Sequence, residues 1–151
     1  MSTQTIPAVE KSVVVAAPVD RAFAVFTEQV ATWWPLHKHG IFQEEAESLA
    51  LETSVGGRFV ERSKTGEESV WGEVLECDPP HRIAFTWHPG FEEGTPPTEI
   101  VVTFAAHGDG TRVTLVHTGW ERLGERGAGS REGYDSGWIG VLEQYRQAAS
   151  G

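Results

Sequence analysis

Two ionisable side chains stand where they could act together as an acid and a base. His117 alternates with Val113 and Leu115 in the segment 111–118, so in a strand all three face the same side. Glu61 alternates with Phe59 in the segment 57–63 and faces the same way as that ring. An inward histidine and carboxylate could exchange protons with a ligand or orient its polar end. The alternative, a histidine satisfied by a neighbour at the rim of a cavity, stays open.

Tryptophan is the second residue type that points to a binding site. The chain contains 6 tryptophans in 151 residues. An indole combines a large apolar area with one N–H donor, which suits pockets for apolar or aromatic ligands. Each tryptophan taken singly could simply fill the core, and only the group indicates a pocket. The candidate ligand-binding residues are Trp33, Trp34, Phe59, Trp71, Phe85, Trp87, His117, Trp120, Tyr134, Gly137, Trp138 and Val141.

The segment "GYDSGWIGVLEQYRQ" (133–147) mixes an apolar helical stripe with glycines. The stripe recurs at offsets of three and four and consists of Tyr134, Trp138, Val141, Leu142 and Tyr145. Each interior glycine costs a helix about 1 kcal/mol relative to alanine. For Gly133 we expect packing or fraying near the helix start. For Gly137 and Gly140 both cavity space and close packing remain open.

Other kinds of chemistry lack a pattern in this chain. His37 and His39 are two residues apart, but no cysteine, histidine or aspartate cluster at a recognisable spacing completes a metal site. We also find no phosphate-binding loop and no dinucleotide fingerprint, so we expect neither metal nor cofactor. Cys77 precedes "DPPH" with no adjacent base and is expected to be inert. These residues favour a binding protein over an enzyme.

The charge balance excludes several classes of partner. Lys and Arg number 12 against 22 Asp and Glu, a formal net charge of -10. That charge repels nucleic acid and anionic membrane surfaces. The apolar runs are short of a membrane span, the first residues do not form a signal peptide, and 1 cysteine fits a reducing compartment. We therefore expect a cytoplasmic protein.

The positioning elements can be predicted from periodicity and turn residues. Helical spacing over 18–34 follows a first strand at 9–17, and we expect two short helices there. The remaining predicted strands cover 47–53, 57–63, 69–77, 82–88, 98–106 and 111–118, with "HGDG" as a hairpin turn. Two irregular stretches remain, 89–97 and 119–133. The second is rich in glycine, and we expect it to gate a cavity with Trp120 and Leu123 as its apolar edge.

This order predicts an α+β fold in a single domain over residues 1–151, with a core of about 10–148. A curved antiparallel sheet of about six or seven strands would wrap around the long C-terminal helix. A cavity between sheet and helix is the natural site for a ligand.

Five segments in this order resemble the START-like (SRPBCC) superfamily. They are "VVVAAPVDRAFAVFTE", "VGGRFVER", "WGEVLECDPPHRIAFTW", "TRVTLVHTGW" and "GWIGVLEQY". The branch most similar is the C-terminal domain of the heat-shock protein 90 ATPase activator. The resemblance implies a helix-grip fold with a hydrophobic cavity. Members of this superfold include lipid carriers, hormone receptors, aromatic cyclases and co-chaperone domains, so it implies function much less closely.

We expect the cavity to bind a small hydrophobic or aromatic ligand. One alternative is an enzyme of the cyclase or hydrolase kind with His117 and Glu61 as its acid–base pair. Another is a protein-interaction module similar to a co-chaperone. A chaperone partner is not expected, because the activator's separate chaperone-binding domain has no counterpart in this sequence. Homodimerisation stays open.

Overall fold

The computed structural model describes residues 6–35, 41–89 and 94–150. Its strands are β1 (Val9–Val15), β2 (Ala46–Leu51), β3 (Arg58–Ser63), β4 (Glu68–Asp78), β5 (Arg82–Trp87), β6 (Thr98–His107) and β7 (Gly110–Thr118). Its helical segments are α1 (Val19–Phe26), α2 (Val30–Trp33), the 3-10 turns η1 (Gln43–Glu45) and η2 (Trp120–Arg126), and α4 (Gly127–Ser150).

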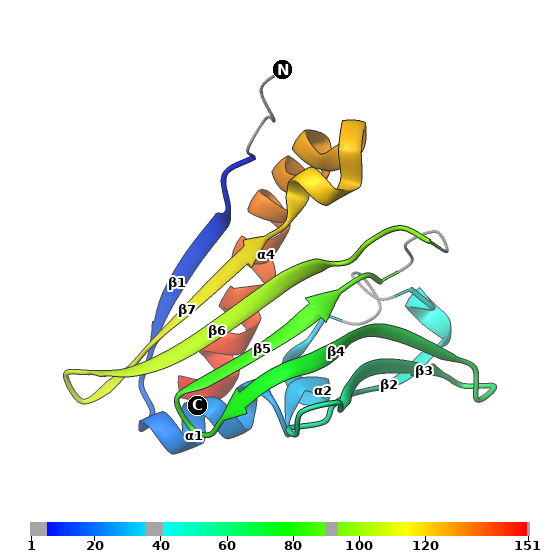
Figure 1. Cartoon of the computed structure of the whole chain (residues 1–151). Coiled ribbons are helices and arrows are strands. Elements are labelled where there is room, and N and C mark those ends of the chain that lie inside the picture. Colours follow the sequence, from blue (N-terminus) through cyan, green and yellow to red (C-terminus); the bar gives the residue numbers. More distant parts are fainter. Residues whose placement is uncertain (1–5, 36–40, 90–93, 151) are drawn as a thin grey trace.

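The strands form one antiparallel sheet of 7 strands in the order β1-β7-β6-β5-β4-β3-β2. Consecutive strands are neighbours from β2 to β7, and β1 joins the far side of β7. Helix α4 lies along one face of this curved sheet, with its C-terminal end beside α1 (Figure 1). The predicted helix-grip architecture, an α+β fold with seven strands around a long C-terminal helix, is confirmed.

Alternating side chains on the strands build the core against α4. In β7, Val113, Leu115 and His117 are all buried on the helix side. In β3, Phe59 and Glu61 are buried in the same way. The sequence prediction that His117 and Glu61 point inward is therefore confirmed, because alternation along a strand is a local property of the extended backbone.

The segment 18–34 divides into α1 and α2, as expected. Helix α1 ends with Thr27 as its C-cap. The Thr27 hydroxyl donates a hydrogen bond to the Phe23 carbonyl, in the last turn of the helix, at 2.8 Å. The "HGDG" hairpin turn between β6 and β7 is also confirmed by the pairing of His107 with Gly110. Strand ends differ from the predicted ones by one or two residues.

The expectation of an irregular loop over 119–133 is wrong. Trp120–Arg126 forms the turn η2, and α4 already begins at Gly127. Gly127 packs so tightly against the Trp120 carbonyl that an added Cβ would lie 2.3 Å from that oxygen. Trp120 itself is fully buried. Tertiary packing has overridden the low helix propensity of the glycines, which is only a weak preference.

Among the described residues, no helix is both long enough and apolar enough to cross a membrane.

Candidate functional site

A pocket of about 380 Å³ opens between the sheet and the first half of α4. It is lined by Trp34, Ile41, Trp71, Trp87, Pro89, Ser130, Gly133, Tyr134, Gly137, Trp138 and Val141. The α4 members recur every three or four residues, so one face of the helix forms one wall. Trp71 of β4 and Trp87 of β5 form the facing wall. Aromatic rings of both the sheet and α4 therefore border the pocket, and Trp87 contacts Trp138 with ring centroids 5.5 Å apart.

Missing side chains on α4 leave part of this space open. A Cβ added at Gly133 or Gly137 would meet no atom within 4 Å, and both residues line the pocket. Gly133, which we expected to pack at a helix end, thus lies at the pocket as well. Gly140 also has open space around it, but it is exposed and lies outside the lining. Of the two glycines left open from the sequence, only Gly137 borders the pocket.

The candidate residues that do not line the pocket pack behind the residues that do. Phe59 contacts Trp71 with ring centroids 5.1 Å apart and Phe85 at 5.5 Å. Trp33 donates its indole N–H to the Val25 carbonyl at 2.7 Å and packs on Tyr145. Figure 1 places its short helix α2 at the far end of α4 from η2. These rings belong to the core around the pocket and do not border it.

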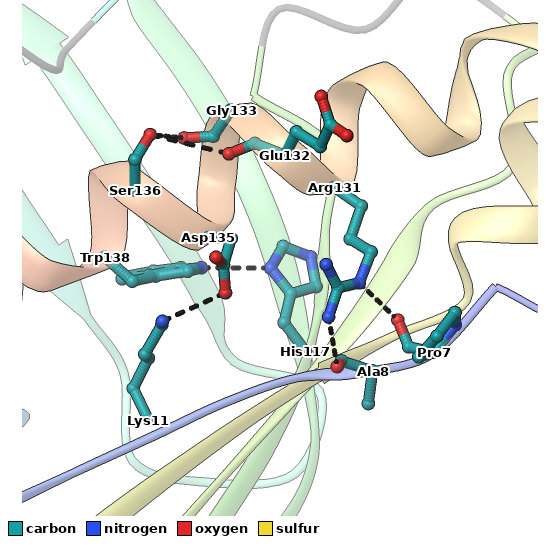
Figure 2. A network of polar contacts seen from close by, with 10 residues as sticks. All are labelled: Pro7, Ala8, Lys11, His117, Arg131, Glu132, Gly133, Asp135, Ser136 and Trp138. Carbon is teal, nitrogen blue, oxygen red and sulfur yellow. Dashed lines mark hydrogen bonds and ion pairs between the residues drawn. The ribbon is translucent and has the colours of Figure 1, made fainter.

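His117 is held by hydrogen bonds at both ring nitrogens. The Trp138 indole N–H donates to Nδ1 at 3.1 Å (Figure 2). Because an indole nitrogen only donates, Nδ1 is an acceptor and the ring hydrogen is assigned to Nε2. Nε2 donates to the Thr98 hydroxyl at 2.7 Å, and that hydroxyl donates to the Trp87 carbonyl at 3.2 Å. The chain of bonds thus connects two residues of the pocket wall, Trp138 and Trp87.

The environment of His117 keeps its ring neutral. The side chain has no exposed surface and stacks on Trp120 with ring centroids 4.1 Å apart. Burial lowers the pKa of His117 to about 3, because no nearby carboxylate compensates the cost of a buried charge. A ring in this state holds Trp138 in place and has no free nitrogen for a ligand.

Glu61 is also occupied by protein donors. Its carboxylate accepts from the Ile41 N–H at 2.7 Å and the Phe42 N–H at 3.0 Å. A third donor is the Trp71 indole N–H, at 3.2 Å. Three N–H donors offset the cost of burying this carboxylate. Glu61 thereby fixes two lining residues, Ile41 and Trp71, from behind.

The acid–base pair considered from the sequence is not assembled as a pair. No hydrogen bond or ion pair joins His117 to Glu61, and neither side chain lines the pocket. Each is bound by its own neighbours, and for His117 this is the alternative that the sequence left open. Sequence reasoning missed Ile41, Pro89, Ser130 and Gly133. Ser130, Gly133 and Gly137 follow one another at intervals of three and four residues, so helical spacing could have found the first two once the helix is known to begin at Gly127. No pattern in the sequence marks Ile41 or Pro89 as lining residues.

Two indole donors at the pocket lack acceptors. Among buried side-chain nitrogen and oxygen atoms of the described residues, only Nε1 of Trp34 and Nε1 of Trp87 have no hydrogen-bond partner. Both residues line the pocket. The other four tryptophans all donate to protein acceptors. An unpaired buried donor costs about 1–3 kcal/mol, so these two are the polar groups that the fold leaves unsatisfied.

Hydrogen bonds and an ion pair join the first turns of α4 to the edge strand β1 and the two residues before it. Arg131 donates from Nε to the Pro7 carbonyl at 2.7 Å and from Nη2 to the Ala8 carbonyl at 3.1 Å (Figure 2). One helical turn further, Asp135 pairs with Lys11 at 2.9 Å. These contacts hold the glycine-rich wall of the pocket against the sheet.

Metal and thiol chemistry gain no support in the described part of the chain. No group of three or more histidine, cysteine, aspartate or glutamate side chains there could hold a metal ion. His37 and His39 lie outside the described residues. Cys77 is half-buried, and burial raises the pKa of its thiol, which keeps the less reactive protonated form.

Comparison with known proteins relates this chain to a family. Residues 16–148 match the family model described as activator of Hsp90 ATPase homolog 1-like protein. The solved anthrahydroquino-γ-pyrone synthase Txn09, determined in a complex, is 39% identical and aligns over 97% of this chain and 99% of its own, with a TM-score of 0.64. No curated protein matches the chain.

Two further solved structures share the fold at lower identity. DynU16, from the dynemicin biosynthetic locus, is 18% identical with a TM-score of 0.68, and the match covers 94% of this chain and 46% of that one. Protein MLL2253 from Mesorhizobium loti is 19% identical with a TM-score of 0.66, over 93% of this chain and 94% of that chain. At these identities the likeness concerns the fold alone.

Proposed function

The chain belongs to the activator of Hsp90 ATPase homolog 1-like family, and we propose that this member binds a planar, polycyclic aromatic molecule between its sheet and α4. Membership agrees with the resemblance seen in the sequence. The family by itself does not choose a ligand, because one fold carries many functions. The proposal therefore depends on the chemistry of the pocket.

The observation that carries the proposal is the aromatic lining of one pocket by rings from both the sheet and α4. Trp71 and Trp87 come from the sheet, and Tyr134 and Trp138 come from α4. Flat rings are bound well against such a lining, through burial of apolar area and favourable ring contacts. The volume of about 380 Å³ lies within the range of about 300–1,000 Å³ that is typical of small-molecule sites.

The unpaired donors support a ligand that carries oxygen atoms. Trp34 and Trp87 each present an N–H without an acceptor beside the pocket. Neither nitrogen reaches the pocket surface, so a ligand oxygen meets one only when the ring turns or a neighbour moves aside. A purely hydrocarbon ligand would leave the Trp34 donor unsatisfied, whereas a quinone or phenol could accept from it.

Ring closure on the bound molecule is the second candidate function. Its support is the 39% identity to a protein named as an anthrahydroquino-γ-pyrone synthase. To form a γ-pyrone, a hydroxyl oxygen bonds to the carbon β to a conjugated carbonyl while its proton passes to the α carbon, and donors to the carbonyl oxygen stabilise the enolate charge that develops in between. The donors beside this pocket are of the required kind. An acid–base pair of His117 and Glu61 is not part of this proposal, since both are bound to protein neighbours.

The test is a titration with 1,8-dihydroxyanthraquinone, followed by quenching of tryptophan fluorescence. The wild-type protein should show saturable quenching. Gly137→Leu should weaken binding by about 10-fold or more, because the new side chain fills the pocket. Gly140→Leu is the matched control, since it makes the same change on an exposed part of the same helix. The proposal fails if the wild-type protein does not bind the probe, or if a folded Gly137→Leu variant binds as tightly as the wild-type protein.

A further inference from the structure

We infer that the hydroxyl of Tyr134 is the hydrogen-bond donor that the pocket offers to an oxygen atom of its ligand. The ligand would be a quinone or a related aromatic ketone or phenol, with that oxygen at the edge of its ring system. The inference rests on the proposed function, because it names the polar contact that an aromatic ligand makes in the same pocket. It also assigns to Tyr134 the role of orienting the polar end of the ligand, which the sequence had suggested for His117 and Glu61.

The position of Tyr134 makes it the group that meets the ligand. Among the described residues that line the pocket, it is the only ionisable one, and Ser130 is the only other one with a hydroxyl. Its ring packs against the rings of His117, Trp120 and Trp138, with centroid distances of 5.2, 5.4 and 6.2 Å respectively. Because these contacts fix the ring, the hydroxyl stays at one place, and ligand binding costs little further conformational entropy for this side chain.

No described residue accepts a hydrogen bond from the hydroxyl of Tyr134. The second tyrosine of the chain provides the comparison. Tyr145, further along the same helix, donates to the Ala22 carbonyl at 2.7 Å and is fully buried. The fold thus uses one tyrosine hydroxyl for its own structure and leaves the other at the pocket.

The Trp87 indole lies on the protein side of this hydroxyl. The two rings meet edge to face at a centroid distance of 6.3 Å and an angle of 81°. The indole N–H has no partner in hydrogen-bond geometry, but it lies near enough to the phenol oxygen to lower the pKa of Tyr134. Because an indole N–H only donates, it approaches a lone pair of that oxygen. The phenol hydrogen is then not used by Trp87 and is available to an acceptor in the pocket that Tyr134 lines.

The protonation state of Tyr134 suits a donor. Burial raises the pKa of Tyr134, and the nearby Trp87 N–H lowers it by a smaller amount. The hydroxyl therefore keeps its hydrogen at neutral pH. A ligand carbonyl oxygen that accepts this hydrogen would be polarised, as addition to its conjugated β carbon requires.

The experiment compares two probes of the same tricyclic shape, 9,10-anthraquinone and anthracene, on the full chain. The wild-type protein should bind anthraquinone more tightly than anthracene. Tyr134→Phe should weaken anthraquinone binding by about 10-fold and leave anthracene binding unchanged, since only the first probe loses a hydrogen bond. Tyr145→Phe is the control, because it removes the same atom from a tyrosine away from the pocket. It should not change the ratio of the two affinities.

A spectroscopic readout separates a direct contact from a structural effect. The infrared carbonyl stretch of bound anthraquinone should lie at a lower frequency in the wild-type complex than in the Tyr134→Phe complex. The inference is overturned if Tyr134→Phe weakens both probes equally, weakens neither, or leaves the carbonyl stretch unchanged. If the wild-type protein binds neither probe, the proposed function falls, and this inference falls with it.

Discussion

The indole N–H of Trp138 donates to Nδ1 of His117 at 3.1 Å, and this contact determines what the histidine can do. The bond assigns the ring hydrogen to Nε2, which donates to Thr98. A proton added to Nδ1 would break the bond to Trp138 and bury a charge. His117 is therefore a positioning residue: it orients a tryptophan of the pocket wall, and both of its ring nitrogens already have protein partners.

Stability should depend on pH through His117. Its pKa in the folded protein is about 3, below the ordinary value of 6.5, so the unfolded chain binds the proton more tightly. The stabilisation is complete above about pH 6.5 and is lost as the pH falls toward about 3, by about 1.4 kcal/mol per pH unit in between. Urea unfolding of the wild-type protein and His117→Asn between about pH 7 and about pH 4 measures it.

The asparagine side chain introduced by His117→Asn still offers an acceptor to Trp138 but does not titrate, so the free energy of unfolding of this variant should fall less steeply with acid. His107→Gln is the control, because His107 is exposed in the turn between β6 and β7. Identical slopes for wild-type and His117→Asn would contradict a buried neutral histidine.

Loss of the Glu61 carboxylate should destabilise the fold and loosen the pocket. Glu61→Ala leaves three N–H donors without an acceptor, at a cost on the order of 3 kcal/mol. Trp71 fluorescence should shift toward longer wavelength as its indole loses its fixed partner. Glu73→Ala, at an exposed position of β4, should change the free energy of unfolding by less than about 0.5 kcal/mol. Equal effects of the two substitutions would count against the described role of Glu61.

Two glycine-to-alanine substitutions should act in opposite directions. In Gly72→Ala the new Cβ would lie 1.7 Å from the backbone oxygen of Thr86, so strands β4 and β5 must separate, and we expect a loss of more than about 3 kcal/mol. In Gly140→Ala the new methyl group meets open space on a helix, which should stabilise by about 0.5–1 kcal/mol. Urea midpoints of both variants provide the measurement. A stable Gly72→Ala protein would contradict the close approach of these strands.

Removal of the Arg131 contacts should loosen the start of α4. Arg131→Ala deletes both hydrogen bonds to the carbonyls of Pro7 and Ala8, so amide exchange in the first turns of α4 should quicken by about 10-fold. Arg146→Ala is the control, because Arg146 pairs with Glu143 on its own helix. Unchanged exchange in Arg131→Ala would show that packing alone holds these turns.

The same exchange measurement tests the gate expected over 119–133, although that segment is helical. Exchange there that slows when an aromatic ligand is added supports a gate. Exchange that is already slow, or that a bound ligand does not change, rules it out.

Local patterns in the sequence determined the elements and the direction of their side chains. Alternation in β7 placed Val113, Leu115 and His117 on one face, and helical spacing placed Tyr134, Trp138 and Val141 on another. Both predictions succeeded because side-chain direction follows from the backbone conformation of a few neighbouring residues. The order of strands and helices then allowed few architectures, and the helix-grip fold was among them.

Contacts between distant segments decided the rest. The sequence shows a histidine facing inward, but only the approach of α4 to β7 brings Trp138 to Nδ1 and makes that histidine neutral. Glu61 likewise meets the Ile41 and Phe42 N–H groups only in the folded chain. The start of α4 depends on the packing of Gly127 against Trp120, which outweighs local propensity. Hydrogen bonds and steric fit act over a few ångströms, so which groups are satisfied and which remain free for a ligand is a property of the tertiary structure.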